Sequence, residues 1–193
     1  MIEIKDKILF KCLEYLNENN WQASYNKVIS DKNFEYQEYC ELLFPNQTHD
    51  IVLYYLDKIN LDLEKEIDSE ELLKLKVRER IIHLIQTKLN LEIVTQNYIQ
   101  KTISYLMMPN HIKDALEVLS ESSNQMWILA DDKSNDFSFY TKRFSLSVIY
   151  TKTLLYWIYD KSNNYNNSWN FLDKQISMLL GFGKIINKIT KKY

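Results

Sequence analysis

The chain has 193 residues, of which 46% are hydrophobic and 26% charged, and its formal net charge is −2. This composition is typical of a globular protein and excludes a disordered or fibrous one. Two Gly and two Pro supply too few tight turns for a many-stranded sandwich or barrel, and the net charge gives no general attraction to nucleic acid phosphates.

The first part of the chain predicts three short helices. Apolar residues recur at helical spacing over residues 3–17, and Asn19-Asn20 ends this helix. A second helix is expected over residues 21–29 and a third over residues 35–43, before Phe44-Pro45. We therefore predict a helix-turn-helix-like head in residues 1–46.

Longer helices with short polar connections follow in residues 47–193. We expect them over residues 48–64, 69–89, 95–107, 111–130, 138–159 and 167–190. A three-helix head before a longer helical body is the layout of TetR-like regulators. The prediction is an all-α, TetR-like helical bundle.

The third predicted helix argues against DNA binding. Glu35, Glu38 and Glu41 recur on it at helical spacing, and the helix carries no Lys or Arg. A recognition helix needs cationic or amide side chains toward the major groove, and three carboxylates would repel the phosphates. We predict no nucleic acid partner and keep a TetR-type ligand-responsive transcriptional regulator as the alternative function.

Catalytic and metal-binding motifs are not apparent in the sequence. We expect His49, His83 and His111 to stand apart, without a second ligand at metal-site spacing. Gly-rich phosphate loops need Gly, which first occurs at position 181. Cys12 and Cys40 suit a reducing compartment and lack metal-ligand spacing. We predict no enzyme activity, catalytic residue, metal or cofactor.

The segment from Phe144 to Tyr159 is apolar nearly all round, with small Ser and Thr residues between the large ones. Such a helix is typical of the centre of a bundle. It is also suited to line a hydrophobic cavity for a lipid. If it does, the expected lipid-contact residues are Leu146, Ile149, Tyr150, Leu154 and Trp157.

An aromatic segment precedes this helix. Phe137, Phe139 and Tyr140 cannot all point inward if Lys142 and Arg143 stay solvated. Exposed aromatic residues beside Arg are typical of protein interfaces, so Phe139 and Tyr140 are either core or interface residues. The expected partner-binding residues are Trp127, Asp136, Phe139, Tyr140 and Arg143. Asp136 alternatively serves as a helix cap.

The end of the chain is basic and amphipathic. Residues 161–193 hold six Lys and one Asp, whereas residues 1–60 hold six Lys and ten Asp or Glu. Such a helix either lies at an anionic membrane surface or packs on the bundle with a solvated Lys face. The expected membrane contacts are Leu179, Leu180, Phe182, Lys184, Ile185, Ile186 and Lys188.

Targeting signals are not apparent in the sequence. Residues 1–7 lack a signal-peptide apolar stretch and an Arg-rich transit pattern. No run reaches the roughly 18 apolar residues of a membrane span. We expect an intracellular protein that is not integral to a membrane.

Two blocks of residues resemble the TetR-like accessory lipid-binding family of coenzyme Q (ubiquinone) biosynthesis. The family signature runs W-x-x-A-G-D-x-S-x-D-F-N-W-Y-T-K-R. The matching residues here are Trp127, Ala130, Asp132, Ser134, Asp136, Phe137, Tyr140, Thr141, Lys142 and Arg143. A second block, W-x-F-L-D-R-R-I in the family, is matched by Trp169, Phe171, Leu172, Asp173 and Ile176.

Four departures from this signature stand out. Asp131 replaces the family's Gly, Ser138 its Asn, Phe139 its Trp, and Lys174-Gln175 its paired Arg. Losing the Gly alters a loop that sets the angle into the next helix. Phe in place of Trp keeps a large ring but loses the indole N–H donor.

The resemblance implies a non-enzymatic protein that binds isoprenoid lipid in residues 47–193 and forms homodimers. It implies association with the membrane surface and with the di-iron demethoxyubiquinone hydroxylase, to which the protein presents the isoprenoid quinone precursor. Because residues 1–7 lack a transit pattern, the expected location is cytoplasmic and of bacterial type, peripherally associated with the inner membrane. It also implies that Asp136, Phe139, Tyr140 and Arg143 form the surface for the hydroxylase.

Overall fold

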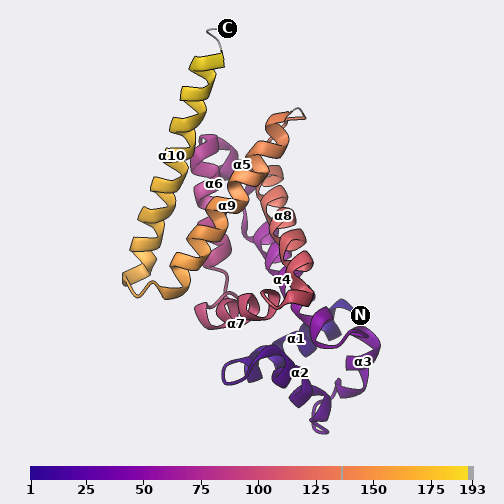
Figure 1. The fold of residues 1–193 in the computed structure, drawn as a ribbon. Helices are drawn as coiled ribbons and strands as arrows, with labels where there is room; N and C mark the ends of the chain where they lie inside the picture. Colours follow the sequence, from indigo (N-terminus) through magenta and orange to yellow (C-terminus); the bar gives the residue numbers. More distant parts are fainter. Residues whose placement is uncertain (136, 191–193) are drawn as a thin grey trace. The chain divides into compact units, whose positions relative to one another are not determined.

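The computed structural model describes residues 1–135 and 137–190, and the side chains of Phe137 and residues 179–190 lie outside the described part (Figure 1). Every regular element in these ranges is a helix, as the sequence predicted. The α-helices are α1 (Ile2–Leu16), α2 (Trp21–Ser30), α3 (Cys40–Leu43), α4 (Thr48–Glu66), α5 (Ser69–Lys74), α6 (Val77–Leu89), α7 (Gln96–Leu106), α8 (Ile112–Leu129), α9 (Phe137–Tyr159) and α10 (Asn166–Thr190). The short 3₁₀ turns are η1 (Gln37–Tyr39), η2 (Pro109–His111) and η3 (Asn163–Tyr165).

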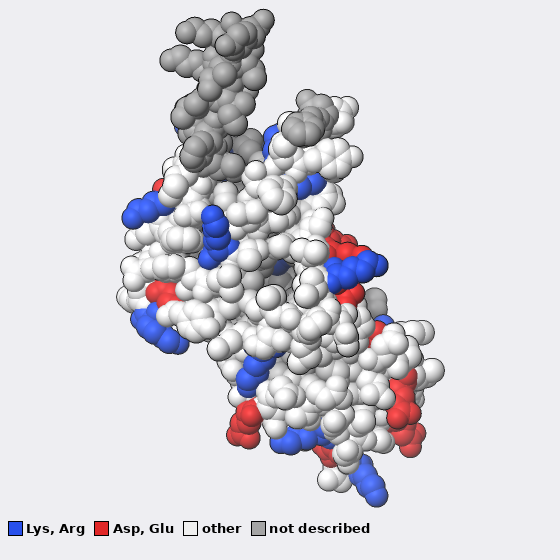
Figure 2. Space-filling model, viewed as in Figure 1, with Lys and Arg blue, Asp and Glu red and all other residues white. Residues whose placement is uncertain are grey.

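The third predicted helix is much shorter than expected. Instead of a helix over residues 35–43, the chain forms the turn η1 and the four-residue α3. Glu35, Glu38 and Glu41 are exposed, and Figure 2 shows acidic side chains over α3 on the face in view. The acidic residues are therefore at the surface, but this segment forms a short turn and a four-residue helix instead of a full-length recognition helix.

The helix predicted over residues 69–89 is divided into α5 and α6. Leu75 and Lys76 between them are extended, although neither is Gly or Pro. Side chains satisfy the backbone groups that the break leaves free. Arg80 donates to the carbonyls of Leu73 and Leu75, and Glu79 accepts a hydrogen bond from the N–H of Lys76.

The chain forms two compact units. Unit 1 comprises Met1–Asp62 and Glu92–Ala115, and unit 2 comprises Leu63–Leu91 and Leu116–Tyr193. The predicted head, residues 1–46, lies entirely in unit 1. None of the described helices is long and apolar enough to cross a membrane.

Trp21 is central to the core of unit 1. Its indole Nε1 donates to Thr102 Oγ1 over 3.0 Å, and its ring centroid lies 5.3 Å from that of Tyr55. At the start of α2, the side chain of Asn20 accepts a hydrogen bond from the N–H of Ala23 and caps the helix. These contacts hold α2 against α4 and α7.

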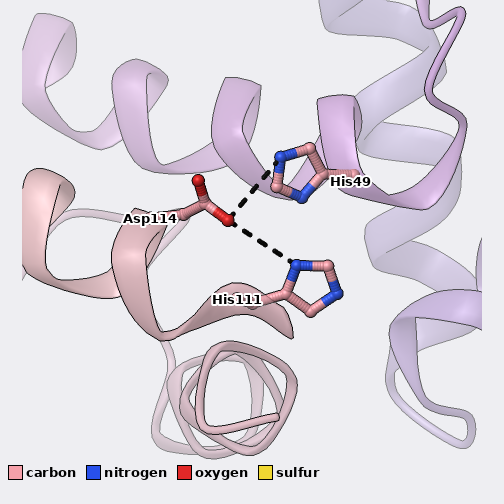
Figure 3. A group of neighbouring side chains, drawn as sticks. All are labelled: His49, His111 and Asp114. Atoms are coloured by element: carbon pink, nitrogen blue, oxygen red, sulfur yellow. Dashed lines mark ion pairs between the residues drawn. The ribbon is translucent and has the colours of Figure 1, made fainter. Parts of the chain in front are cut away.

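The expectation that the histidines stand apart is wrong for His49 and His111, both in unit 1. Their ring centroids lie 5.0 Å apart, and both side chains face Asp114 (Figure 3). The fold brings the first turn of α4 to the first turn of α8, a proximity that spacing along the chain does not reveal.

In unit 2, α10 packs against α9 and α6. The rings of Tyr156 and Phe171 stack at 4.7 Å, and Arg78 of α6 pairs with Asp173 of α10. The second signature block therefore contributes Phe171 and Asp173 to the packing of α10. Leu172 and Ile176 of the same block are buried.

Candidate functional site

Unit 2 carries an open groove of about 970 Å³ between α8 and α9. Both helices contribute apolar and charged side chains to it. The lining residues on α8 are Leu116, Glu117, Leu119, Ser120, Glu121 and Asn124, and those on α9 are Phe139, Tyr140, Arg143, Phe144, Ser147, Val148, Thr151 and Lys152. Three of the five predicted partner-binding residues, Phe139, Tyr140 and Arg143, thus converge on one surface.

The groove is bordered by large apolar side chains that face solvent. Tyr140 is 70% exposed, Phe144 73% and Leu116 63%. Tyr140, Phe144 and Val148 recur every four residues, so they form a stripe along one face of α9. An exposed apolar surface of this kind is typical of a binding site for a protein or a lipid.

The side chain of Arg143 is mostly buried and is fixed by hydrogen bonds to neighbouring residues of unit 2. Its Nε donates to Asn124 Oδ1 over 2.7 Å, and its Nη1 lies 3.1 Å from Asp132 Oδ2. Its guanidinium carbon lies 3.4 Å from the centroid of the Phe139 ring. Because its side chain is only 12% exposed, Arg143 orients Phe139 and the start of α9 and offers little surface of its own.

Asp132 accepts hydrogen bonds from three side chains near the start of α9. Besides Arg143, it accepts hydrogen bonds from Lys142 Nζ and Ser134 Oγ, both over 2.6 Å. Burial raises the pKa of the Asp132 carboxyl, and the hydrogen bonds from Lys142, Ser134 and Arg143 lower it more, to about 2. The carboxylate is therefore charged at neutral pH and binds both cations.

Asp131, which stands where the family has Gly, has a backbone conformation that favours Gly. Its φ is 60°, the left-handed conformation that Gly adopts most readily at the end of a helix. The N–H of Asp132 donates to the carbonyl of Trp127, which is the long hydrogen bond of a Schellman turn. The loop after α8 therefore forms a glycine-type turn with Asp in the left-handed position.

The other two predicted partner-binding residues are Trp127 and Asp136. Trp127 does not line the groove, and Lys142 Nζ lies 5.5 Å from the centroid of its ring. The indole Nε1 of Trp127 is buried and has no hydrogen-bond partner among the described residues. Asp136 lies outside the described residues.

The predicted lipid-contact residues lie away from the exposed stripe of α9. Leu146, Ile149, Tyr150 and Trp157 are buried, and Leu154 is partly buried. None of the five lines the groove between α8 and α9. They form part of the apolar interior of unit 2. This position is expected both if α9 is a core helix and if it lines a lipid cavity.

A buried lysine lies beside this interior. Lys88 of α6 donates to Ser122 Oγ over 3.0 Å, and its Nζ lies 5.5 Å from the centroid of the Tyr150 ring. Burial lowers the pKa of Lys88 to about 7, because a charged ammonium is unfavourable in an apolar environment. The sequence did not indicate that Lys88 is buried, because its neighbours on α6 have the pattern of an ordinary amphipathic helix.

The predicted membrane contacts all lie in the second half of α10. Their side chains lie outside the described part of the structure, which ends at Met178 for this helix. The helix itself continues to Thr190.

Sequence reasoning also missed four residues of the groove region: Leu116, Asn124, Asp132 and Phe144. The signal for Phe144 was its position four residues after Tyr140, on the same helix face. Leu116 and Asn124 belong to another helix, so only the fold brings them to this surface.

Comparisons with known proteins confirm the resemblance. Residues 112–183, which include α8 and α9 and much of α10, match the COQ9 family model. The chain is 24% identical over 196 residues to the mitochondrial ubiquinone biosynthesis protein COQ9 of Homo sapiens and to that of Rattus norvegicus. It is 27% identical to the probable ubiquinone biosynthesis protein coq9 of Dictyostelium discoideum.

Each of these matches covers 97% of this chain and 61–63% of the relative. The chain thus spans about three fifths of the length of the curated relatives it matches.

A solved structure has the same fold. The crystal structure of the TetR transcriptional regulator from Nitrosomonas europaea matches with a TM-score of 0.74, covering 91% of this chain and 97% of that chain. The two sequences are 20% identical, so the likeness concerns the fold alone. The predicted TetR-like, all-α fold is confirmed.

Proposed function

We propose that this chain is a non-enzymatic, lipid-binding accessory protein of ubiquinone biosynthesis. It presents the isoprenoid quinone precursor to the membrane-associated, di-iron demethoxyubiquinone hydroxylase. The observation that carries the proposal is the apolar groove between α8 and α9, where Phe139, Tyr140 and Arg143 of the family signature meet. The same residues lie within the segment that matches the COQ9 family model.

The groove is proposed to bind the hydroxylase. Tyr140 and Phe144 offer large rings to solvent, and aromatic residues often contribute most of the energy of a protein interface. Phe139 is held by Arg143, so part of the surface is ordered before the partner arrives. The proposed contacts are Tyr140, Phe144 and Phe139, and Arg143 positions Phe139. Trp127 and Asp136 are proposed as further partner-binding residues on the family signature alone.

The lipid is proposed to bind in the apolar interior of unit 2. Leu146, Ile149, Tyr150, Leu154 and Trp157 supply apolar surface for an isoprenoid chain. The ammonium of Lys88, beside Tyr150, supplies a hydrogen-bond donor for an oxygen of the quinone head group. Such a lipid diffuses poorly through water, so a protein that carries its head group to the enzyme lowers the barrier to reaction.

Association with the membrane surface is proposed for the second half of α10. Its sequence alternates apolar residues with Lys184 and Lys188, which suits an anionic bilayer surface. We also propose a homodimer and a location at the cytoplasmic face of the inner membrane. No cofactor and no nucleic acid partner are part of this function.

Binding of the purified hydroxylase to immobilised protein tests the proposal. Tyr140→Ala should weaken binding by at least about tenfold, since an interface anchor contributes 2 kcal/mol or more. Tyr159→Ala is the matched control, because Tyr159 is also 70% exposed on α9 but does not line the groove. Equal binding by both variants and the unmodified protein would reject the groove as the docking site.

A gel-shift assay with the DNA upstream of the protein's own gene tests the alternative regulator. Salt-dependent binding to this duplex would contradict the proposed function, because a regulator must bind DNA to act. The exposed Glu35, Glu38 and Glu41 lead us to expect no shift.

A further inference from the structure

His49, His111 and Asp114 form a compact cluster in unit 1, separate from the groove and from the interior of unit 2 (Figure 3). Asp114 Oδ2 lies 3.9 Å from Nε2 of His49 and 3.6 Å from Nδ1 of His111. The three side chains come from the first turn of α4, the end of η2 and the first turn of α8. Three potential ligand atoms, one from each residue, lie within 4.8 Å of one another.

The imidazole rings are held in place by stacking. The ring of His111 lies 5.0 Å from that of His49 and 4.4 Å from that of Tyr105, at interplanar angles below 20°. Each of the three cluster side chains is at most 27% exposed. Aromatic contacts of this kind restrict ring rotation, so the cluster is partly ordered without any ligand.

The cluster contains polar atoms that the described residues do not satisfy. Nδ1 of His49 and Nδ1 of His111 are buried, and neither has a hydrogen-bond partner in the described part of the chain. A buried nitrogen left without a partner is unfavourable, because it has lost its hydrogen bond to water and gained none in the protein. The unpartnered Nδ1 of His111 faces Asp114 Oδ2 at 3.6 Å, whereas His49 faces the same oxygen with its other nitrogen, Nε2. A buried nitrogen without a partner beside a carboxylate is a sign of a ligand that accepts its lone pair.

The donor set selects the kind of ion. Two imidazole nitrogens and one carboxylate oxygen suit Zn²⁺ and similar divalent transition metals, whereas Mg²⁺ and Ca²⁺ prefer oxygen ligands throughout. Ligand atoms around a tetrahedral Zn²⁺ lie about 3.4 Å apart, given metal–ligand distances near 2.1 Å. Asp114 Oδ2 lies 3.6 and 3.9 Å from the two imidazole nitrogens, and the ligand atoms of the three residues all lie within 4.8 Å of one another, so the side chains have to move closer together to hold the ion.

We propose that His49, His111 and Asp114 bind a divalent transition metal ion, with Zn²⁺ as the best fit, and leave the fourth position to water. The ion fastens the start of α4 to the start of α8, which belong to the two chain segments that together make unit 1. Because the unfolded chain does not bring these residues together, the ion stabilises the folded state. This inference is independent of the proposed function.

The test uses the full chain without any affinity tag, freed of metal by a chelator and titrated with Zn²⁺ by calorimetry. Zn²⁺ should bind one site per chain and raise the unfolding temperature, and Mg²⁺ should do neither. The variants His111→Ala and Asp114→Asn should each weaken Zn²⁺ binding by more than about tenfold, a loss seen even for residues that only support metal ligands. Circular dichroism checks that both variants are folded.

His83→Ala is the control, because His83 is the third histidine of the chain and is exposed on α6 in unit 2. It should bind Zn²⁺ like the unmodified protein. Asp114→Asn keeps the size of the side chain, so it separates the loss of a ligand from a loss of packing. The proposal is overturned if the unmodified protein does not bind Zn²⁺, or if His83→Ala weakens binding as much as Asp114→Asn does.

Discussion

Arg143 lies over the ring of Phe139, with its guanidinium carbon 3.4 Å from the ring centroid. The two residues are one helical turn apart on α9, and Phe139 stands where the family has Trp. A cation over an aromatic face is attracted by the ring, and Phe retains this interaction although it lacks the indole N–H. Phe at this position therefore supplies an aromatic face for Arg143 without an indole N–H donor.

Replacing Arg143 should destabilise the protein. Arg143→Ala removes hydrogen bonds to Asp132 and Asn124 as well as the contact with Phe139, so we expect a loss of about 1–3 kcal/mol in the free energy of unfolding. Arg143→Lys keeps the charge but not the planar fork and should lose less. Urea denaturation of the three proteins measures both effects. Equal stability of Arg143→Ala and the unmodified protein would contradict the positioning role.

Asp132 should make stability depend on acid pH. Its folded pKa is about 2, below the ordinary 3.8, so its stabilising effect is present above about pH 4 and is lost as the pH falls toward 2. Compared with Asp132→Asn, the unmodified protein should be more stable at pH 6, and this advantage should shrink between pH 4 and pH 2. Denaturation midpoints of both proteins across this range provide the measurement. An advantage independent of pH would show that the charge of Asp132 is not responsible.

Asp131→Gly should stabilise the protein by roughly 1 kcal/mol, because φ of 60° is strained for a residue with a Cβ but not for Gly. Asp131→Ala provides the control. It removes the ion pair with Lys133, 3.4 Å away, without relieving the backbone. Thermal unfolding should place Asp131→Gly above the unmodified protein and Asp131→Ala below it. The reverse order would show that the side chain matters more than the backbone.

Lys88 should make stability rise with alkaline pH. Its folded pKa, about 7, is below the ordinary 10.5, so the unfolded chain binds more protons between these values. The folded state therefore gains stability as the pH rises from about 7 toward 10.5. Relative to Lys88→Met, which does not titrate, the unmodified protein should be more stable at pH 9 than at pH 7. A constant difference between the two would contradict burial of the ammonium.

Periodicity predicted the helices well where tertiary contacts agreed with local preference. The bounds of α1, α2, α4, α7, α8, α9 and α10 lie within two residues of the predicted ones. The break between α5 and α6 was missed because its determinants are the side chains of Arg80 and Glu79 rather than Gly or Pro. Side-chain capping of this kind is difficult to recognise in a single sequence.

Sequence also left the orientation of α9 undecided. A helix that is apolar nearly all round gives no strong preference for one buried face, so Phe144 could not be distinguished from Leu146. The structure exposes Phe144 and buries Leu146.

The His49–His111–Asp114 cluster could be predicted only in part. The three-residue spacing of His111 and Asp114 was available in the sequence, but the approach of His49 depends on the fold.

The most direct test of the proposed function is native mass spectrometry of the purified protein, followed by organic extraction and identification of what is released. We expect a polyisoprenoid lipid or quinone precursor bound in stoichiometric amount. Leu154→Glu, which introduces a charge among the proposed lipid contacts, should reduce the bound lipid while circular dichroism still reports a folded protein. A protein that contains no lipid, and that does not bind added isoprenoid quinones, would contradict the account.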